Sequence, residues 1–300
     1  MSKAARVLAC NNPPRSFPTR MPVTVTETRT LEQLRQHYEV ERELADRLRH
    51  ATKEQRRTLY SEVYDELFKR VPLHPQHTNK ADAARLAADV AEKMEITAPF
   101  LSKDAVFLEV GPGDCEFAKA VAKKVARVLA IDVSDEITHK RELPTNLQLV
   151  ISDGSSIPVE PASVNVAYSN QLMEHLHPDD ALDQLRGLHA ALKPGGVYIC
   201  ITPSRLTGPH DISCVFDREA TGFHLKEYTV GDLSALFRQV GFAHVRIIFG
   251  GRGKFLLLPT WTATICERLL DLLPHSLRKA IALKPPFRWL FGVRLVGFKS

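Results

Sequence analysis

The sequence contains no run of about 18 consecutive apolar residues, so it predicts no transmembrane helix. Cysteine is scarce, because the 300 residues include 5 cysteines and no two of them form a CxxC pair. An odd number without paired spacing argues against a disulfide framework and a cysteine zinc site, and it favours a reducing, cytoplasmic compartment. No metal ligands are expected, and the sequence contains no internal repeat.

Positive charge is missing from the middle of the chain. The formal net charge is +5, residues 1–30 carry +4 and residues 251–300 carry +7, which leaves −6 for the residues between them. A nucleic-acid enzyme more often has a basic face on its core domain, so no nucleic-acid partner is expected. Residues 1–30 lack the apolar core of a signal peptide and are interpreted as a disordered basic tail, with Met1 and Met21 both open as the start.

Residues 31–78 have apolar side chains at helical spacings among many charges, which predicts a helical extension. Thr52 and Gln55 fit a capping box that begins a second helix, because hydroxyl and amide can satisfy each other's backbone N–H groups. The extension either packs on the main domain as a solvated addition or forms a lid over a substrate pocket. Both interpretations stay open.

Residues 79–250 alternate between strand and helix patterns. Short apolar runs predict strands at 105–110, 127–133, 147–152, 164–169, 197–202 and 244–249. Helical periodicity predicts helices at 81–101, 114–125, 181–192 and 230–240. This alternation is typical of an α/β domain with a mostly parallel sheet and helices on both faces. Residues 251–291 are expected to form an amphipathic helical insertion, and residues 292–300 the final strand.

The strongest local signal is a glycine turn after the first strand, in Glu109-Val-Gly111-Pro-Gly113. Glycine has no Cβ, so a ligand can approach the backbone closely. A dinucleotide fingerprint needs a small residue at position 116, where this chain has Glu116. That charge disfavours a pyrophosphate, and with it an NAD-dependent dehydrogenase. Glu109 suggests a ligand that carries a positive group.

Acidic residues also follow the next two predicted strands. Asp132 lies 21 residues after Gly111, where a carboxylate can accept hydrogen bonds from ribose hydroxyls. Asp153 follows the third strand and precedes Gly154. Its carboxylate either accepts a hydrogen bond from an adenine amino group or forms a simple turn.

Several motifs occur in one order: EVGPGD, Asp132, Asp153-Gly154, VNVAYSNQLMEHL, ALKPGG and HLKEYTVGDLSALFRQVGF. By them, residues 79–250 resemble the class I S-adenosylmethionine-dependent methyltransferases, particularly the type 11 subgroup. The resemblance implies a Rossmann-like sheet of seven strands in the order 3-2-1-4-5-7-6, with strand 7 antiparallel. Many members have a third glycine where this chain has Cys115.

The resemblance also implies roles for individual residues around S-adenosylmethionine. The methionine end would be lined by Glu109, Gly111 and Gly113. Asp132 would hold the ribose, and Asp153 with Gly154 the adenine. Asn170 and Gln171 would lie near the sulfonium.

Histidines on loops after the strands are candidates for a general base, since an oxygen or carbon acceptor often has to lose a proton. His210 and His224 are the favoured pair, and His175 comes next. Each of them has a structural interpretation as well, and a nitrogen or thiolate acceptor needs no base.

We therefore expect methyl transfer to a small-molecule acceptor by in-line displacement, which depends mostly on alignment. One alternative is a peripheral-membrane methyltransferase of a lipid or quinone, held on the membrane through the basic amphipathic residues 265–290. In the other reading of that stretch, its apolar face is buried on the domain or in a dimer. A second alternative is an S-adenosylmethionine-binding partner protein that has lost catalysis.

Overall fold

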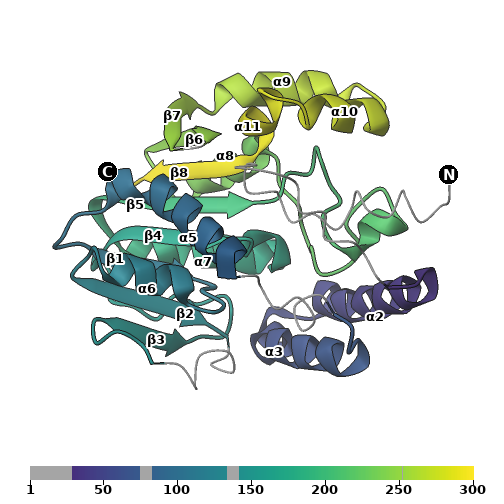
Figure 1. Cartoon of the computed structure of the whole chain (residues 1–300), viewed down its shortest axis with the longest axis horizontal. Coiled ribbons are helices and arrows are strands. Elements are labelled where there is room, and N and C mark those ends of the chain that lie inside the picture. Colours follow the sequence, from purple (N-terminus) through teal and green to yellow (C-terminus); the bar gives the residue numbers. More distant parts are fainter. Residues whose placement is uncertain (1–28, 75–82, 134–141, 252) are drawn as a thin grey trace.

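The computed structural model describes residues 29–74, 83–133, 142–251 and 253–300 (Figure 1). Two helices, α2 (Leu31–His50) and α3 (Lys53–Arg70), precede an α/β unit with a central sheet. The predicted basic tail lies outside the described residues except for its last two positions. The structure can therefore be compared with the predicted helical extension at residues 31–78 and the predicted α/β domain at residues 79–250.

Eight strands form one sheet in the order β3-β2-β1-β4-β5-β8-β6-β7. The strands are β1 (Val106–Val110), β2 (Arg127–Asp132), β3 (Leu147–Ile151), β4 (Val164–Asn170), β5 (Leu192–Thr202), β6 (His244–Gly251), β7 (Lys254–Pro259) and β8 (Val293–Phe298). The first five pair in parallel, whereas β8 is antiparallel to both β5 and β6. This is the predicted order with one strand added at the edge, so the Rossmann-like α/β fold is confirmed.

Helices cover both faces of this sheet. On one face lie α5 (Ala83–Thr97) and α6 (Glu116–Ala122), around a core that includes Phe107 and Tyr168. On the other lie α7 (Pro178–Ala191) and α8 (Val230–Gln239), around Leu108 and Tyr198. Alternate residues of a strand point to opposite faces, so strands buried on both sides appear as continuous apolar runs. In such a sheet, ligands bind beyond the carboxyl ends of the strands.

The fifth strand begins earlier than predicted. The predicted helix at 181–192 and the predicted strand at 197–202 leave residues 193–196 between them, but α7 ends at Ala191 and β5 already begins at Leu192, which pairs with Val164 before an irregularity in the ladder. Gly195 has a φ of 77°, a conformation that glycine adopts without a steric penalty. The turn at Gly195 therefore lies inside β5.

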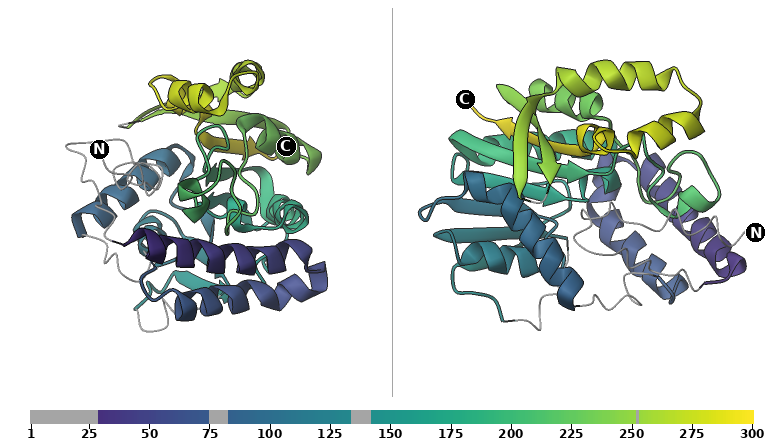
Figure 2. Two further views of the ribbon diagram at one scale, coloured as in Figure 1. Left: turned by 90° about the vertical axis from the view of Figure 1, so that its right-hand side faces the viewer. Right: turned by 45° about the horizontal axis from the view of Figure 1, so that its top comes forward.

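The N-terminal helices are fixed to the α/β unit (Figure 2). The predicted capping box is confirmed, since Gln55 N donates to Thr52 Oγ1 (3.3 Å) and Thr52 N donates to Gln55 Oε1 (2.8 Å). Arg56 of α3 donates to both carboxylate oxygens of Asp180 in α7, at 2.6 and 2.9 Å, and both side chains are buried. Tyr60 also donates to Asp180, at 2.7 Å. This buried network holds α3 against the start of α7.

The segment after β6 is more than a helical insertion. It begins with β7, which forms a hairpin with β6, and continues with α9 (Trp261–Asp271), α10 (His275–Ala282) and α11 (Phe287–Phe291). The extra strand was missed because Lys254–Pro259 is a short apolar run beside a helical pattern. Within the described residues, no helix is long and apolar enough to cross a membrane.

Candidate functional site

The register of the parallel strands collects the predicted cofactor residues at one edge of the sheet. Val110 of β1 is level with Ile131 of β2 and Ser169 of β4. The next residue on each strand or turn is Gly111, Asp132 and Asn170, which are therefore neighbours. Gly111 N donates to the Ile131 carbonyl (2.8 Å), which fixes the turn against β2. The glycine turn, the Asp132 carboxylate and the Asn170 amide thus lie together at the carboxyl ends of three adjacent strands.

Glu109 is a buried carboxylate behind this turn. Its side chain lies on the side of α5 and α6, is 4% exposed, and its Oε2 atom has no hydrogen-bond partner among the described residues. Burial raises the pKa of Glu109 to about 8; Lys93 opposes the shift, and the charges of Asp114 and Asp132 add to it. The arrangement is unfavourable for an anion unless a positive group comes close.

The glycine loop keeps the conformation that the sequence suggests. Gly111 and Gly113 have φ values of 70° and 56°, and a Cβ on Gly113 would meet no described atom within 4 Å. Cys115, which replaces a third glycine, is buried with a φ of 60°. A cysteine therefore occupies a left-handed conformation that usually selects glycine.

Two residues with strained backbone, Cys115 and Gln171, lie at the same edge of the sheet. Among the described residues other than glycine, Cys115, Ala162 and Gln171 have a positive φ, and Gln171 directly follows Asn170 at the end of β4. Gln171 Nε2 is buried without a hydrogen-bond partner in the described part of the chain. Strained backbone and unsatisfied polar atoms are features that cluster at binding sites.

Asp132 and Asp153 differ in their surroundings. Asp132 Oδ1 accepts from Val133 N (2.7 Å) at the end of β2. Asp153 Oδ1 accepts from Ser155 N (3.0 Å) and Ser156 N (2.7 Å), so the turn that the sequence left open is present. Burial acts to raise the pKa of Asp153, but the hydrogen bonds from Ser156 and Ser155 outweigh it and hold that pKa below its usual value. The adenine role of Asp153 stays a prediction.

A second set of polar residues surrounds a cavity of about 180 Å³. All three predicted catalytic histidines line it: His175, His210 and His224. His175 lies in the short helix η2 (Met173–His175), four residues after Gln171, and η3 (Ile212–Val215) follows His210. The wall opposite is formed by α2 and α3, through Glu41 and other residues. The N-terminal helices thus border a cavity near the strand ends that carry the predicted cofactor residues.

His224 and His210 share one carboxylate. His224 Nδ1 lies 2.8 Å from Glu227 Oε1, which also accepts from His210 N at 2.7 Å. Burial acts to lower the pKa of His224, but the hydrogen bond from Glu227 and the charges of Glu174 and Asp211 raise it to about 9. Burial lowers the pKa of His210 below its usual value.

His175 and Glu174 complete this group. His175 Nδ1 is 3.1 Å from the Phe223 carbonyl and 3.1 Å from the Tyr64 hydroxyl. Burial and the neighbouring His224 lower the pKa of His175 to about 3. Glu174 is fully buried, and burial raises its pKa to about 7 against the opposing effect of His224.

Sequence reasoning missed the residues that α2 contributes. His37 and Glu41 are buried on the same stripe as Leu34 and Leu44, and His37 Nε2 lies 2.9 Å from Glu41 Oε2. Glu41 Oε1 accepts from Phe223 N at 2.9 Å. The available signal was the presence of two polar residues at a spacing of four within the apolar stripe of a helix.

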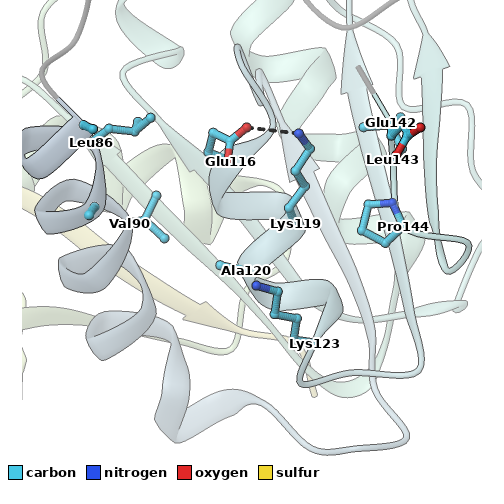
Figure 3. A pocket seen from close by; sticks show the side chains of 11 residues that line it. Leu86, Val90, Glu116, Lys119, Ala120, Lys123, Glu142, Leu143 and Pro144 are labelled. Atoms are coloured by element: carbon cyan, nitrogen blue, oxygen red, sulfur yellow. Dashed lines mark hydrogen bonds and ion pairs between the residues drawn. The ribbon is translucent and has the colours of Figure 1, made fainter. Parts of the chain in front are cut away.

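A larger cavity of about 590 Å³ lies between α5 and α6 (Figure 3). Leu86 and Val90 of α5 face Glu116 and Lys119 of α6, and Lys123 just after α6, across it. Glu116 pairs with Lys119 at 3.0 Å. Its described lining contains none of the predicted cofactor or catalytic residues. The smaller cavity is therefore the better candidate site for chemistry.

Comparisons with known proteins agree with this geometry. Residues 108–200 match the family model described as a methyltransferase domain. A protein of Mycolicibacterium smegmatis named a probable S-adenosylmethionine-dependent methyltransferase is 29% identical over 136 residues, 45% of this chain and 51% of that protein. The chain thus spans about half the length of that curated relative.

Two further matches are a second curated relative, found by sequence, and a solved structure, found by fold. The phosphoethanolamine N-methyltransferase 1 of Triticum aestivum is 29% identical over 96 residues, 30% of this chain and 19% of that protein. The solved complex of the Haloferax volcanii Trm112 methyltransferase activator with a methyltransferase contains a chain with a TM-score of 0.49 and 15% identity, over 73% of this chain and 94% of that one.

Proposed function

We propose that this chain, whose residues 108–200 form a class I S-adenosylmethionine-dependent methyltransferase domain, transfers a methyl group from S-adenosylmethionine to a small-molecule acceptor. The observation that carries the proposal is the register of β1, β2 and β4. It supports a single cofactor cleft, because Gly111, Asp132 and Asn170 end neighbouring strands at the same level.

In this proposal the cofactor lies across the strand ends. Glu109, Gly111 and Gly113 hold the methionine end, and Asp132 accepts hydrogen bonds from the ribose. The adenine lies against Asp153 and Gly154, and the sulfonium near Asn170 and Gln171. The orphaned Oε2 atom of Glu109 supports a cationic group at this end of the ligand.

The acceptor enters the cavity bordered by α2, α3 and the histidines. A volume of about 180 Å³ lies below the roughly 300–1,000 Å³ of typical ligand pockets, which supports a small acceptor or a small acceptor group. The acceptor atom bonds the methyl carbon as the sulfur leaves, and an O–H acceptor also gives up its proton. His210, His224 and His175 are the candidates for handling that proton.

The test has a binding arm and a transfer arm. Calorimetry with S-adenosylmethionine should give one site per chain. Incubation with methyl-labelled cofactor and fractions of polar metabolites should then label one small product. The variant His210→Ala should slow transfer by about 10²–10⁴-fold with little change in cofactor affinity. The exposed His244 supplies the control, His244→Ala. Absence of cofactor binding would contradict the proposal, whereas binding without transfer to any fraction would support an inactive partner protein.

A second candidate function is methylation of a lipid or quinone at a membrane surface. Trp261, Ile265, Leu269 and Leu272 lie on one face of α9 and its end, and they are 63%, 54%, 62% and 81% exposed. This apolar face of α9 is therefore not covered by other described parts of the same chain. Exposed basic side chains flank it, which favours an anionic surface.

The apolar face is connected to the cavity through α10. Lys279 Nζ donates to the Gly208 carbonyl (3.3 Å), two residues before His210. Flotation with anionic vesicles should recover the protein, and Trp261→Ser with Leu269→Ser should abolish recovery. Leu31→Ser, at another exposed leucine, is the matched control. Equal recovery of all three proteins, or a dimer that the double variant dissociates, would contradict membrane binding by this face.

A further inference from the structure

Two histidines of the cavity wall, His175 and His224, converge with the buried Glu174 behind them. Glu174 and His175 follow β4, and His224 lies in the loop before α8. One ligand atom from each lies within 4.8 Å of the other two. Glu174 Oε1 and His175 Nε2 are 4.0 Å apart, which is too far for a hydrogen bond. Two ligand atoms of a tetrahedral ion lie about 3.4 Å apart, so these two atoms have to approach by about 0.6 Å when an ion binds.

Nδ1 of both His175 and His224 already forms a hydrogen bond. His175 Nδ1–H donates to the Phe223 carbonyl at 3.1 Å, and His224 Nδ1–H donates to Glu227 Oε1 at 2.8 Å. Nε2 is therefore the atom that each ring can offer to an ion, and on His224, whose pKa is raised to about 9, the ion has to displace a proton. Metal-binding histidines typically have this arrangement, in which a carbonyl or carboxylate orients the ring and fixes its tautomer.

Glu174 provides an independent observation. Its side chain is fully buried, and Oε2 accepts from the Thr202 hydroxyl at 2.8 Å. Oε1 is buried too, with no hydrogen-bond partner among the described residues. Burying a carboxylate oxygen without a partner is unfavourable, unless a cation occupies the space that it faces.

We propose that Glu174, His175 and His224 bind a divalent transition-metal ion, with Zn²⁺ as the expected ion. Two imidazoles and one carboxylate form a three-ligand set that leaves a fourth position for a ligand from the cavity. Imidazole ligands favour zinc and its neighbours over Mg²⁺. No metal ligands were expected from the cysteine spacing, and that spacing carries no information about histidines from separate loops.

The neighbouring group of His37, Glu41 and His74 also has metal-like spacing, but its members have other partners. His37 Nδ1 accepts from Arg29 at 2.8 Å, and its Nε2 is 2.9 Å from Glu41 Oε2. Glu41 Oε1 accepts from the Phe223 amide. This group is therefore assigned to holding α2 against the Phe223 loop.

The role of the ion rests on the proposed function. It binds the acceptor oxygen or sulfur at its open position and lowers the pKa of that group. The acceptor proton then passes to His210, a histidine of the cavity lining that is not among the proposed metal ligands. Metal binding itself is independent of methyl transfer and can be measured without it.

The experiment uses the full chain after dialysis against a chelator. Calorimetry with ZnCl₂ should give one site, and CoCl₂ should produce the visible absorption bands of a four- or five-coordinate ion. Glu174→Gln, His175→Ala and His224→Ala should each weaken binding by more than about 100-fold. His37→Ala and His244→Ala should bind as the wild type does.

Circular dichroism and S-adenosylmethionine binding report on folding of each variant. If a variant fails to fold, the cobalt spectrum of the wild-type protein still decides, since octahedral coordination by water gives only weak bands. The proposal is wrong if the wild-type protein binds no Zn²⁺, or if His37→Ala removes the site while Glu174→Gln retains it. Cofactor binding without metal binding overturns only this inference, whereas metal binding without cofactor binding overturns only the proposed function.

Discussion

Glu109 should couple cofactor binding to the release of a proton. Its pKa of about 8 means that about 0.9 of the molecules carry a proton on Glu109 at pH 7 in the free protein. A cationic group placed beside the carboxylate favours the ionised form, so binding of S-adenosylmethionine should drive that proton off. The expected release is about 0.9 proton per cofactor at pH 7, and close to none at pH 9.5.

Calorimetry measures this release directly, because the observed enthalpy varies with the ionisation enthalpy of the buffer. Titrations in phosphate and in Tris at the same pH give the number of protons. The variant Glu109→Gln should bind the cofactor more weakly and release none. If wild type and variant show the same buffer dependence at pH 7, the assignment of the proton to Glu109 is wrong.

The same group sets a pH dependence of stability in the free protein. The pKa of Glu109 rises from 4.5 to about 8 on folding, so the folded state binds the proton more tightly. Stability therefore falls as pH rises from about 4.5 to about 8, and the loss is complete above pH 8. At 1.36 kcal/mol per pKa unit, the ceiling is about 5 kcal/mol. Urea denaturation gives the free energy of unfolding at pH 5 and at pH 8. Glu109→Gln should make these two free energies more alike than they are in the wild-type protein, and an unchanged gap between them would contradict the reasoning.

Two further predictions follow from the fold and the cofactor edge. Asp132→Ala should weaken S-adenosylmethionine binding by about 10–100-fold in calorimetry, with an unchanged denaturation midpoint, because it removes charge-assisted hydrogen bonds at a strand end. Unchanged affinity would contradict the placement of the ribose. Arg56→Leu should destabilise the protein by about 3–5 kcal/mol in urea denaturation, since Asp180 is then a buried carboxylate without its cationic partner and keeps only the hydrogen bond from Tyr60 among the described side chains. The exposed pair of Arg47 and Glu66 provides the control, where Arg47→Leu should change stability by about 0–1 kcal/mol, and an equal effect of both variants would refute the role of burial.

Much of the sheet could be predicted because its strands are buried on both faces. A short apolar run such as Val106–Val110 is readily recognised as a strand, because the segments around it have helical periodicity and this run does not. The glycine turn and Asp132 were recognisable for a related reason, since each directly follows such a run. β7 escaped prediction because its pattern is short and its leucines stay partly exposed.

The cavity could not be predicted in the same way, because its walls come from segments far apart in the chain. His37 and Glu41 belong to α2, whereas His210 and His224 lie beyond β5. Nothing local to any of these residues specifies the others. Glu174 lies within a recognised motif, but only the buried surroundings of its Oε1 atom distinguish it from an ordinary surface glutamate.

The peptide group of Phe223 has a consequence for how acceptor choice can diverge among related proteins. Its N–H is held by Glu41 and its carbonyl by His175, so a helix near the start of the chain orients a ring that follows β4. Every residue lining this cavity except His175 lies outside the segment that matches the methyltransferase family. If the cavity holds the acceptor as proposed, changes in the flanking helices and loops can alter which acceptor is accommodated while the strand ends proposed to bind the cofactor stay unchanged.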